Sequence, residues 1–107
     1  MANFLLVYSG GSGMAPAQAE QAAIMQAWTS WFTKLGSAVV DGGNPIAPVA
    51  KHVSHGGKVS DGPAGVMASG YSIIKADSLA AAVELAKGCP ALQGDAQVTV
   101  FETFPAM

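Results

Sequence analysis

The chain opens with a segment whose side chains alternate as they do in a strand. Residues 3–9, NFLLVYS, are rich in strand-forming side chains. Phe4, Leu6 and Tyr8 share one face of this strand, and Leu5 and Val7 share the other. Both faces are apolar, so we expect helices to cover one of them and a second sheet, borrowed from another copy of the chain, to cover the other.

A helix is predicted over residues 16–35. A Gly-rich loop precedes it, and Pro16 suits the first turn of a helix. Apolar side chains then recur at helical spacing: Ile24, Trp28, Trp31 or Phe32, and Leu35. Gly36 is a typical stop signal.

A second helix is predicted over SLAAAVELAK, residues 78–87. Asp77 is the expected N-cap, because an Asp side chain accepts a hydrogen bond from the first turn of a helix. We expect Leu79, Val83 and Ala86 to form its buried face. Gly88 and Pro90 end the segment.

Further strands are predicted at residues 37–41, 70–76 and 96–104, and a hairpin is predicted at residues 49–60, closed by His55, Gly56 and Gly57. The resulting order is β-α-β-hairpin-β-α-β. This order predicts one α+β domain over residues 1–107, a ferredoxin-like split βαβ with one antiparallel sheet and with helices on one face. Two such sheets packed face to face make a dimeric α+β barrel.

Composition adds an argument for self-association. The 107 residues are 50% hydrophobic and only 11% charged, whereas a soluble domain has roughly 25% charged residues. A small domain has a large surface for its volume, and this chain has too little charge to cover it in the usual way. We therefore expect a homodimer or a larger homo-oligomer.

Charge excludes several classes of partner. The net charge is −2, and all five basic residues are Lys. Nucleic-acid binding and attachment to an anionic membrane surface both need clustered cations, so neither is expected. The apolar runs are far shorter than a membrane span, and the first residues lack the basic region of a signal peptide. The single Cys89 can form no internal disulfide. These features predict a cytoplasmic protein.

Three blocks of sequence together resemble the YCII-related (DGPF-type) domain family. They are VVDGGNP at residues 39–45, SGYSIIKADSLAAAVELAKGCPAL at residues 69–92, and QVTVFET at residues 97–103. The SDGP stretch at residues 60–63 is similar to the motif that names the DGPF branch, with Ala64 where that motif has Phe. The resemblance covers roughly residues 3–104.

The resemblance implies a dimeric α+β barrel and a homodimer or larger assembly. It implies no single reaction, although some members are thought to be enzymes with a His–Asp pair in the cleft. Relatives often carry a His directly after the first strand, where this chain has Ser9.

Candidate acid–base groups are few. His52 is the better placed of two histidines, because a His paired with Asp41 or Asp61 can act as a general base near neutral pH. Asp41 and Asp61 each precede a Gly, so each could instead stabilise a turn with its side chain. His55 lies three residues from His52, which in an extended segment puts the two on opposite faces, so we do not expect them to share a metal ion.

Candidate ligand-contacting residues are Tyr8, Ser9, Trp28, Asn44 and Tyr71. Tyr8 lies on an apolar strand face, so its hydroxyl enters the cavity if that face is the barrel interior. Trp28 and Trp31 could be core residues, and one of them could close the end of a cleft, since an indole N–H needs a partner. Asn44 supplies both a donor and an acceptor.

Three functions remain open from sequence. The first is acid–base chemistry on a small apolar metabolite, carried by His52, Asp41 and Asp61. The second is a non-catalytic dimer that binds a small molecule or supports another protein. The third is a structural dimer with a filled barrel. No cofactor or metal is expected, because the Gly-rich loop lacks the Lys-Ser/Thr of a P-loop and the spacing of a dinucleotide fingerprint.

Overall fold

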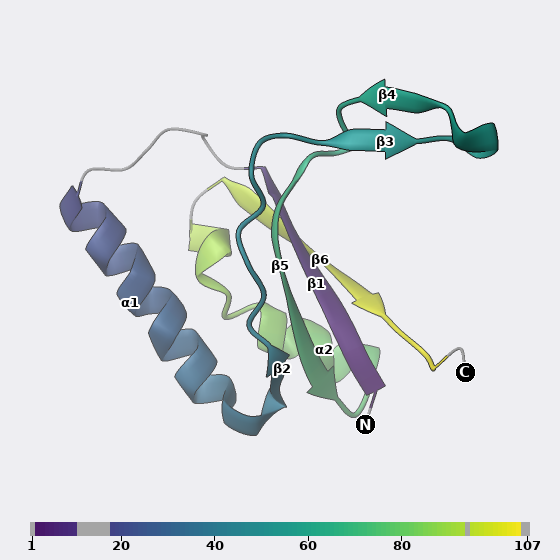
Figure 1. Ribbon diagram of the computed structural model, residues 1–107. Helices are drawn as coiled ribbons and strands as arrows, with labels where there is room; N and C mark the ends of the chain where they lie inside the picture. The colour runs from purple at the N-terminus through teal and green to yellow at the C-terminus, as the bar shows by residue number, and fades with distance from the viewer. Residues whose placement is uncertain (1, 11–17, 94, 106–107) are drawn as a thin grey trace.

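The computed structural model describes residues 2–10, 18–93 and 95–105. It has the predicted α+β architecture: a four-stranded sheet, two helices and a separate two-stranded hairpin (Figure 1). The strand order in the large sheet is β2-β5-β1-β6, and every neighbouring pair is antiparallel.

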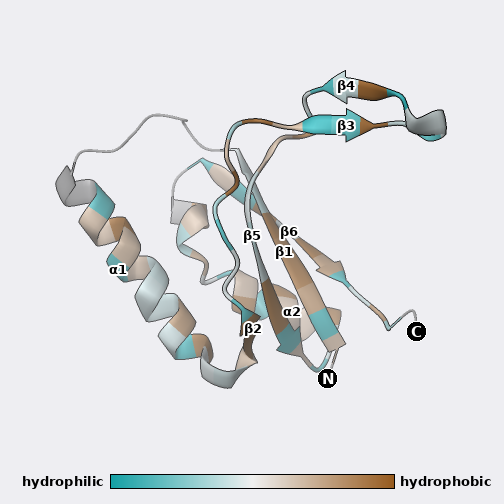
Figure 2. Ribbon diagram, in the orientation of Figure 1, coloured by the Kyte–Doolittle hydropathy of each residue, from teal (hydrophilic) through white to brown (hydrophobic). Residues whose placement is uncertain are grey.

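The centre of the sheet is β1 (Ala2–Gly10), between β5 (Ala68–Ala76) and β6 (Ala96–Glu102). These elements confirm the strands predicted at residues 3–9, 70–76 and 96–104. Phe4, Leu6 and Tyr8 are buried on one face, as their alternation predicts. Apolar residues follow one another in the middle of β1 and at Ile73 and Ile74 of β5 (Figure 2).

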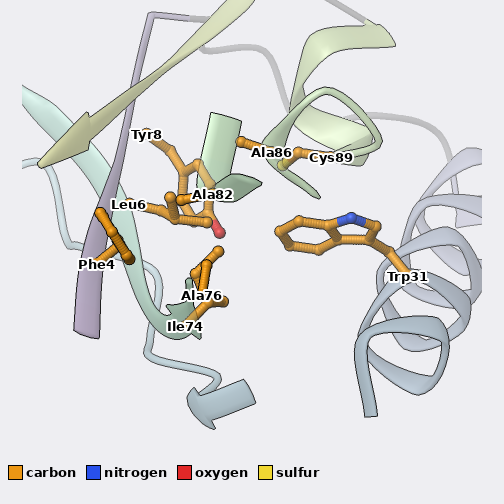
Figure 3. Close-up of a cluster of buried hydrophobic side chains, with 9 residues drawn as sticks. All are labelled: Phe4, Leu6, Tyr8, Trp31, Ile74, Ala76, Ala82, Ala86 and Cys89. Carbon is orange, nitrogen blue, oxygen red and sulfur yellow. The ribbon is translucent and has the colours of Figure 1, made fainter. Parts of the chain in front are cut away.

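The first helix, α1 (Gln18–Leu35), confirms the helix predicted from apolar spacing; Pro16 lies outside the described residues. Trp31 is buried, and its indole Nε1 donates a hydrogen bond to the carbonyl oxygen of Leu85 at 3.3 Å. Its ring points from α1 toward the side chains of β1 (Figure 3). The indole therefore ties α1 to the rest of the core, with its polar atom satisfied.

The second helix, α2 (Leu79–Ala86), corrects two predictions. Its N-cap is Ser78, not Asp77, because the Ser78 hydroxyl accepts a hydrogen bond from the Ala81 amide at 3.1 Å. Ala86 is buried as predicted, but the other buried residue is Ala82, while Leu79 and Val83 are exposed. Alanines on the inner side let the helix approach the sheet closely, which turns the larger side chains outward.

The edge strand β2 (Val39–Asp41) is shorter than the predicted 37–41, because a 3₁₀ turn (Gly36–Ala38) follows α1. Another 3₁₀ turn, Pro90–Gln93, links α2 to β6. Within the described ranges, no helix is long and apolar enough to cross a membrane.

The hairpin predicted at residues 49–60 is confirmed. Strand β3 (Lys51–Val53) pairs with β4 (Val59–Asp61), and the 3₁₀ turn His55–Gly57 joins them. Gly56 and Gly57 both have positive φ, which a Gly-Gly pair adopts without strain. We call residues 46–67 the arm. It projects away from α1 beyond the end of the large sheet (Figure 1).

The large sheet has an outer face, opposite the helices. The register places Leu5, Ile73 and Phe101 in one row across this face and Val7 and Tyr71 in the next. Phe101 is 50% exposed, and the others are partly buried. The core side chains of both helices belong to the cluster on the opposite face, so this apolar outer face lacks a helical cover in the described structure.

Candidate functional site

A pocket of about 380 Å³ lies between α1 and the end of the sheet from which the arm leaves. Its size falls within the range of small-molecule sites, roughly 300–1,000 Å³. Among the described residues, its lining consists of Tyr8, Met25, Trp28, Phe32, Gly42, Gly43, Asn44, Pro45, Ser69, Gly70, Tyr71, Ser72, Ala91 and Ala96. We call it the aromatic pocket.

One helical face supplies the aromatic wall. Met25, Trp28 and Phe32 are three and four residues apart, so they lie on one side of α1. The Trp28 ring meets the Tyr8 ring edge-on, with centroids 5.1 Å apart, and lies 5.8 Å from the Phe32 ring. Such contacts between rings hold each side chain in place, so the wall is formed before any ligand arrives.

A chain of two hydrogen bonds through the buried Ser72 hydroxyl forms the floor. The Tyr8 hydroxyl donates to the Ser72 hydroxyl at 2.7 Å, and the Ser72 hydroxyl donates to the Gly42 carbonyl at 2.7 Å. Both hydroxyl protons are therefore committed, and no polar side-chain atom buried in the described structure lacks a partner. The floor joins β1, β5 and the segment after β2.

Burial changes the pKa of two groups at the floor of the pocket, Tyr8 and Cys89. It raises the pKa of Tyr8 to about 12, because desolvation penalises the phenolate; the Ser72 hydrogen bond acts in the opposite direction but less strongly. Burial also raises the pKa of the neighbouring Cys89 thiol. Both groups are neutral at physiological pH, so neither is a ready nucleophile or base.

The rim of the pocket is the segment 42–45, which runs beside β5. Asp41 Oδ1 accepts a hydrogen bond from the Gly43 amide at 2.8 Å, and Pro45 forms a bridge with Gly70. Gly43 has a φ of +75°, and a Cβ there would lie 1.7 Å from the Tyr71 carbonyl oxygen. Only glycine allows this close approach, so Gly43 sets the width of the rim.

Four of the five predicted ligand-contacting residues contribute to the lining of this pocket: Tyr8, Trp28, Asn44 and Tyr71. Tyr71 does so from a strand position opposite Val7, whose side chains belong to the outer face of the sheet. The Asn44 side-chain amide lies 3.5 Å from the Tyr71 hydroxyl. The fifth residue, Ser9, is not part of the lining. It follows Tyr8 at a register shift in β1, opposite Ala68 and Gln97.

The predicted acid–base residues His52, Asp41 and Asp61 do not lie together in the folded structure. His52 is opposite Ser60 in the arm, whereas Asp61 is opposite Lys51 and forms an ion pair with it. Neighbouring positions in a strand face opposite sides, so His52 and Asp61 lie on opposite faces of the hairpin. Asp41 is a turn residue through its bond to Gly43. No charged side chain lines the aromatic pocket among the residues described.

Sequence reasoning missed Ser72, Met25 and Phe32 as site residues. Ser72 carried a usable signal, because a small polar residue in phase with Ile74 on a buried strand face needs a polar partner. Met25 and Phe32 share the helical phase of Trp28. That phase was visible, but which side of the helix meets a cavity depends on the tertiary packing.

No protein-family model matches the chain, and no curated protein matches it.

Proposed function

We propose that the chain is a YCII-related (DGPF-type) domain with a ferredoxin-like split βαβ. The order β2-β5-β1-β6 supports this, since it leaves the first two strands of the large sheet parallel and separated by β5. The proposal also rests on the residue blocks described above. Ala64 and Ser9 are its departures from the family pattern.

We further propose that the protein is a homodimer in which two outer faces pack together, giving a dimeric α+β barrel. The apolar rows of Leu5, Ile73 and Phe101 and of Val7 and Tyr71 support this arrangement. An apolar sheet face left in water is costly, and a second sheet covers it at the usual packing distance of about 10 Å.

The aromatic pocket supports the binding of a small, uncharged, largely apolar ligand better than it supports catalysis. The observation that carries this proposal is the lining, which combines three aromatic rings from Tyr8, Trp28 and Phe32 and, among the residues that the structure describes, has no charged side chain. A charged ligand would lose its hydration there without gaining a counter-ion. An apolar ligand would gain contact area with preformed walls.

Acid–base chemistry on the same ligand needs a base, and the described part of the chain places none in this pocket. His52 is in the arm, Asp61 is paired with Lys51, and Asp41 caps a turn. Tyr8 has a pKa of about 12 and already donates its proton to Ser72. We therefore favour binding without turnover as the function of this dimer.

A pair of matched probes tests the proposal. 4-Methylphenol and 4-hydroxybenzoate share a phenol ring, but only the second carries a carboxylate at neutral pH. We expect 4-methylphenol to bind by calorimetry and to shift the NMR signals of Tyr8 and Asn44. We expect 4-hydroxybenzoate to bind at least about tenfold more weakly, which is about 1.4 kcal/mol.

The variant Trp28→Ala should lose this binding, and Ile24→Ala should keep it, because Ile24 is on the same helix but outside the lining. Binding of both probes with equal affinity would contradict an uncharged-ligand site. Binding of neither would contradict the pocket as a site for small phenols.

A further inference from the structure

Gly42 faces the aromatic wall of the pocket and has no side chain to fill the space between them. Its carbonyl oxygen is held by the Ser72 hydroxyl at 2.7 Å. An alanine Cβ at this position would lie 3.9 Å from Cζ and 4.0 Å from Cε2 of the Phe32 ring. Both distances are ordinary contacts between carbon atoms. The gap between Gly42 and the Phe32 ring therefore has room for one layer of carbon atoms.

Gly70 has a related role on another side of the pocket. It is buried in β5, and it pairs with Tyr8 of β1. A Cβ at Gly70 would lie only 3.3 Å from Cδ2 of the Tyr8 ring, which is closer than most such contacts. The ring therefore packs against the strand backbone itself, as aromatic side chains do beside a strand glycine. Ring and backbone together close this side of the pocket.

The surfaces that remain are the faces and edges of aromatic rings. Tyr8 and Trp28 meet edge-on at 5.1 Å, and Trp28 and Phe32 are tilted by 37° at 5.8 Å. A further aromatic ring gains the attraction between ring quadrupoles in addition to the burial of its surface. A saturated ring of the same size gains only the burial. The wall therefore favours an aromatic ligand over an aliphatic one.

We propose that the ligand of the aromatic pocket is a planar aromatic molecule, whose ring enters the gap between Gly42 and the Phe32 ring. The inference rests on the proposed binding function and adds to it a ligand class and a residue that determines specificity, Gly42. An aromatic ring is one carbon atom thick, which matches the gap. The carbon atoms of a cyclohexane chair lie in two layers, so a saturated ring must push the rim away from α1.

The rim resists such a movement. The Ser72 hydroxyl holds the Gly42 carbonyl, and Asp41 Oδ1 accepts a hydrogen bond from the Gly43 amide at 2.8 Å. On the other side of the rim, the Tyr71 amide donates to the Asn44 carbonyl at 3.3 Å. Widening the gap would strain or break these bonds, and this cost falls on the thicker ligand alone.

A pair of probes that differ in planarity tests the ligand class. 4-Methylphenol and trans-4-methylcyclohexanol are both uncharged and carry a methyl group and a hydroxyl at opposite ends of a six-membered ring. We expect calorimetry on the unsubstituted protein to show at least about tenfold weaker binding of the saturated alcohol. This measurement needs no variant, so it does not depend on how well any variant folds.

The variant Gly42→Ala tests the role of this residue. Gly42 has no positive φ, so alanine fits its backbone without strain. The added methyl group occupies the gap to Phe32, and we expect binding of 4-methylphenol to weaken at least about tenfold. Gly36→Ala is the control, because a Cβ at Gly36 meets nothing within 4 Å and Gly36 is outside the lining. It should keep the affinity of the unsubstituted protein.

The outcomes separate this inference from the binding function on which it rests. Equal affinity for the planar and the saturated probe overturns the planar ligand class and leaves an apolar binding pocket standing. Unchanged binding of 4-methylphenol to Gly42→Ala overturns the role of Gly42 in specificity. Binding of neither probe overturns both the inference and the proposed binding of small phenols.

Discussion

The hydroxyl of Tyr8 donates to the hydroxyl of Ser72 at 2.7 Å, across two neighbouring strands and 64 positions of sequence. The Ser72 hydroxyl in turn donates a hydrogen bond to the Gly42 carbonyl. This bond therefore joins the floor of the aromatic pocket to its rim.

Replacing Ser72 with Ala should destabilise the fold by about 1–3 kcal/mol, because the Tyr8 hydroxyl and the Gly42 carbonyl would both lose their buried partner. Tyr8→Phe should cost less, about 1 kcal/mol, since Ser72 can still donate to Gly42. Urea unfolding measures both free energies. Equal costs for the two variants would contradict the direction of the hydrogen-bond chain.

Tyr8 should lose its hydroxyl proton at a higher pH than an ordinary tyrosine does. In a Tyr71→Phe variant it is the only tyrosine left, so the phenolate absorbance reports it alone, with a pKa of about 12. The folded pKa lies above the ordinary value of 10.0, so the unfolded chain releases this proton first as the pH rises. The contribution of Tyr8 to stability is complete below pH 10 and is lost between pH 10 and about 12.

Thermal unfolding across this pH range provides the check. The fall in stability should be smaller in Tyr8→Phe than in the unsubstituted protein, because the variant has no proton to release at this position. An identical fall in both would show that other groups, such as the lysines, account for the alkaline loss.

Gly43→Ala should be strongly destabilising, by about 3 kcal/mol or more, because the new Cβ would clash with the Tyr71 backbone. Gly36→Ala is the matched control. Gly36 also has positive φ, but a Cβ there meets nothing within 4 Å, so only the backbone strain of about 1 kcal/mol remains. Denaturant unfolding compares the two, and similar costs would contradict the close approach at the rim.

Asp61→Asn should change stability by less than about 1 kcal/mol. Asp61 pairs with Lys51, but both side chains are largely exposed, and water screens such pairs. The variant should also leave the binding of 4-methylphenol unchanged by calorimetry, because Asp61 is outside the aromatic pocket. A loss of binding in this variant would show that the arm contributes to the ligand site. It would contradict a pocket that one chain forms without its arm.

Phe101→Glu should convert the protein to a monomer of 10.8 kDa, since a carboxylate in the outer sheet face cannot be buried without a partner. Leu92→Glu is the control, because Leu92 is a similarly exposed apolar residue in the 3₁₀ turn Pro90–Gln93. Light scattering gives both masses. If the two variants keep the same dimeric mass, the outer face is not the interface.

Local pattern alone determined much of the fold. The strand at residues 3–9 and the helix before Gly36 follow from periodicity, because each buried side chain must recur at the period of its own backbone. The Gly-Gly hairpin follows from turn chemistry. The N-cap of α2 was predicted one residue too early, because Asp77 and Ser78 are both good caps and only the position of the first turn decides between them.

The buried face of α2 is a second feature that the local sequence pattern did not predict correctly. Hydrophobicity favours Leu79 and Val83, but Ala82 and Ala86 face the sheet. The distance between helix and sheet decides this, and that distance is a property of the whole packing.

The sequence by itself determined the order of the elements, the apolar character of both faces of β1, and a short set of side chains able to contact a ligand. Only the tertiary structure decided which of them meet. It brought Tyr8, Trp28, Asn44 and Tyr71 into one pocket and left His52 and Asp61 in the arm. The reason is that local pattern reports on which face a side chain lies, whereas proximity depends on strand register and on how the helices close over the sheet.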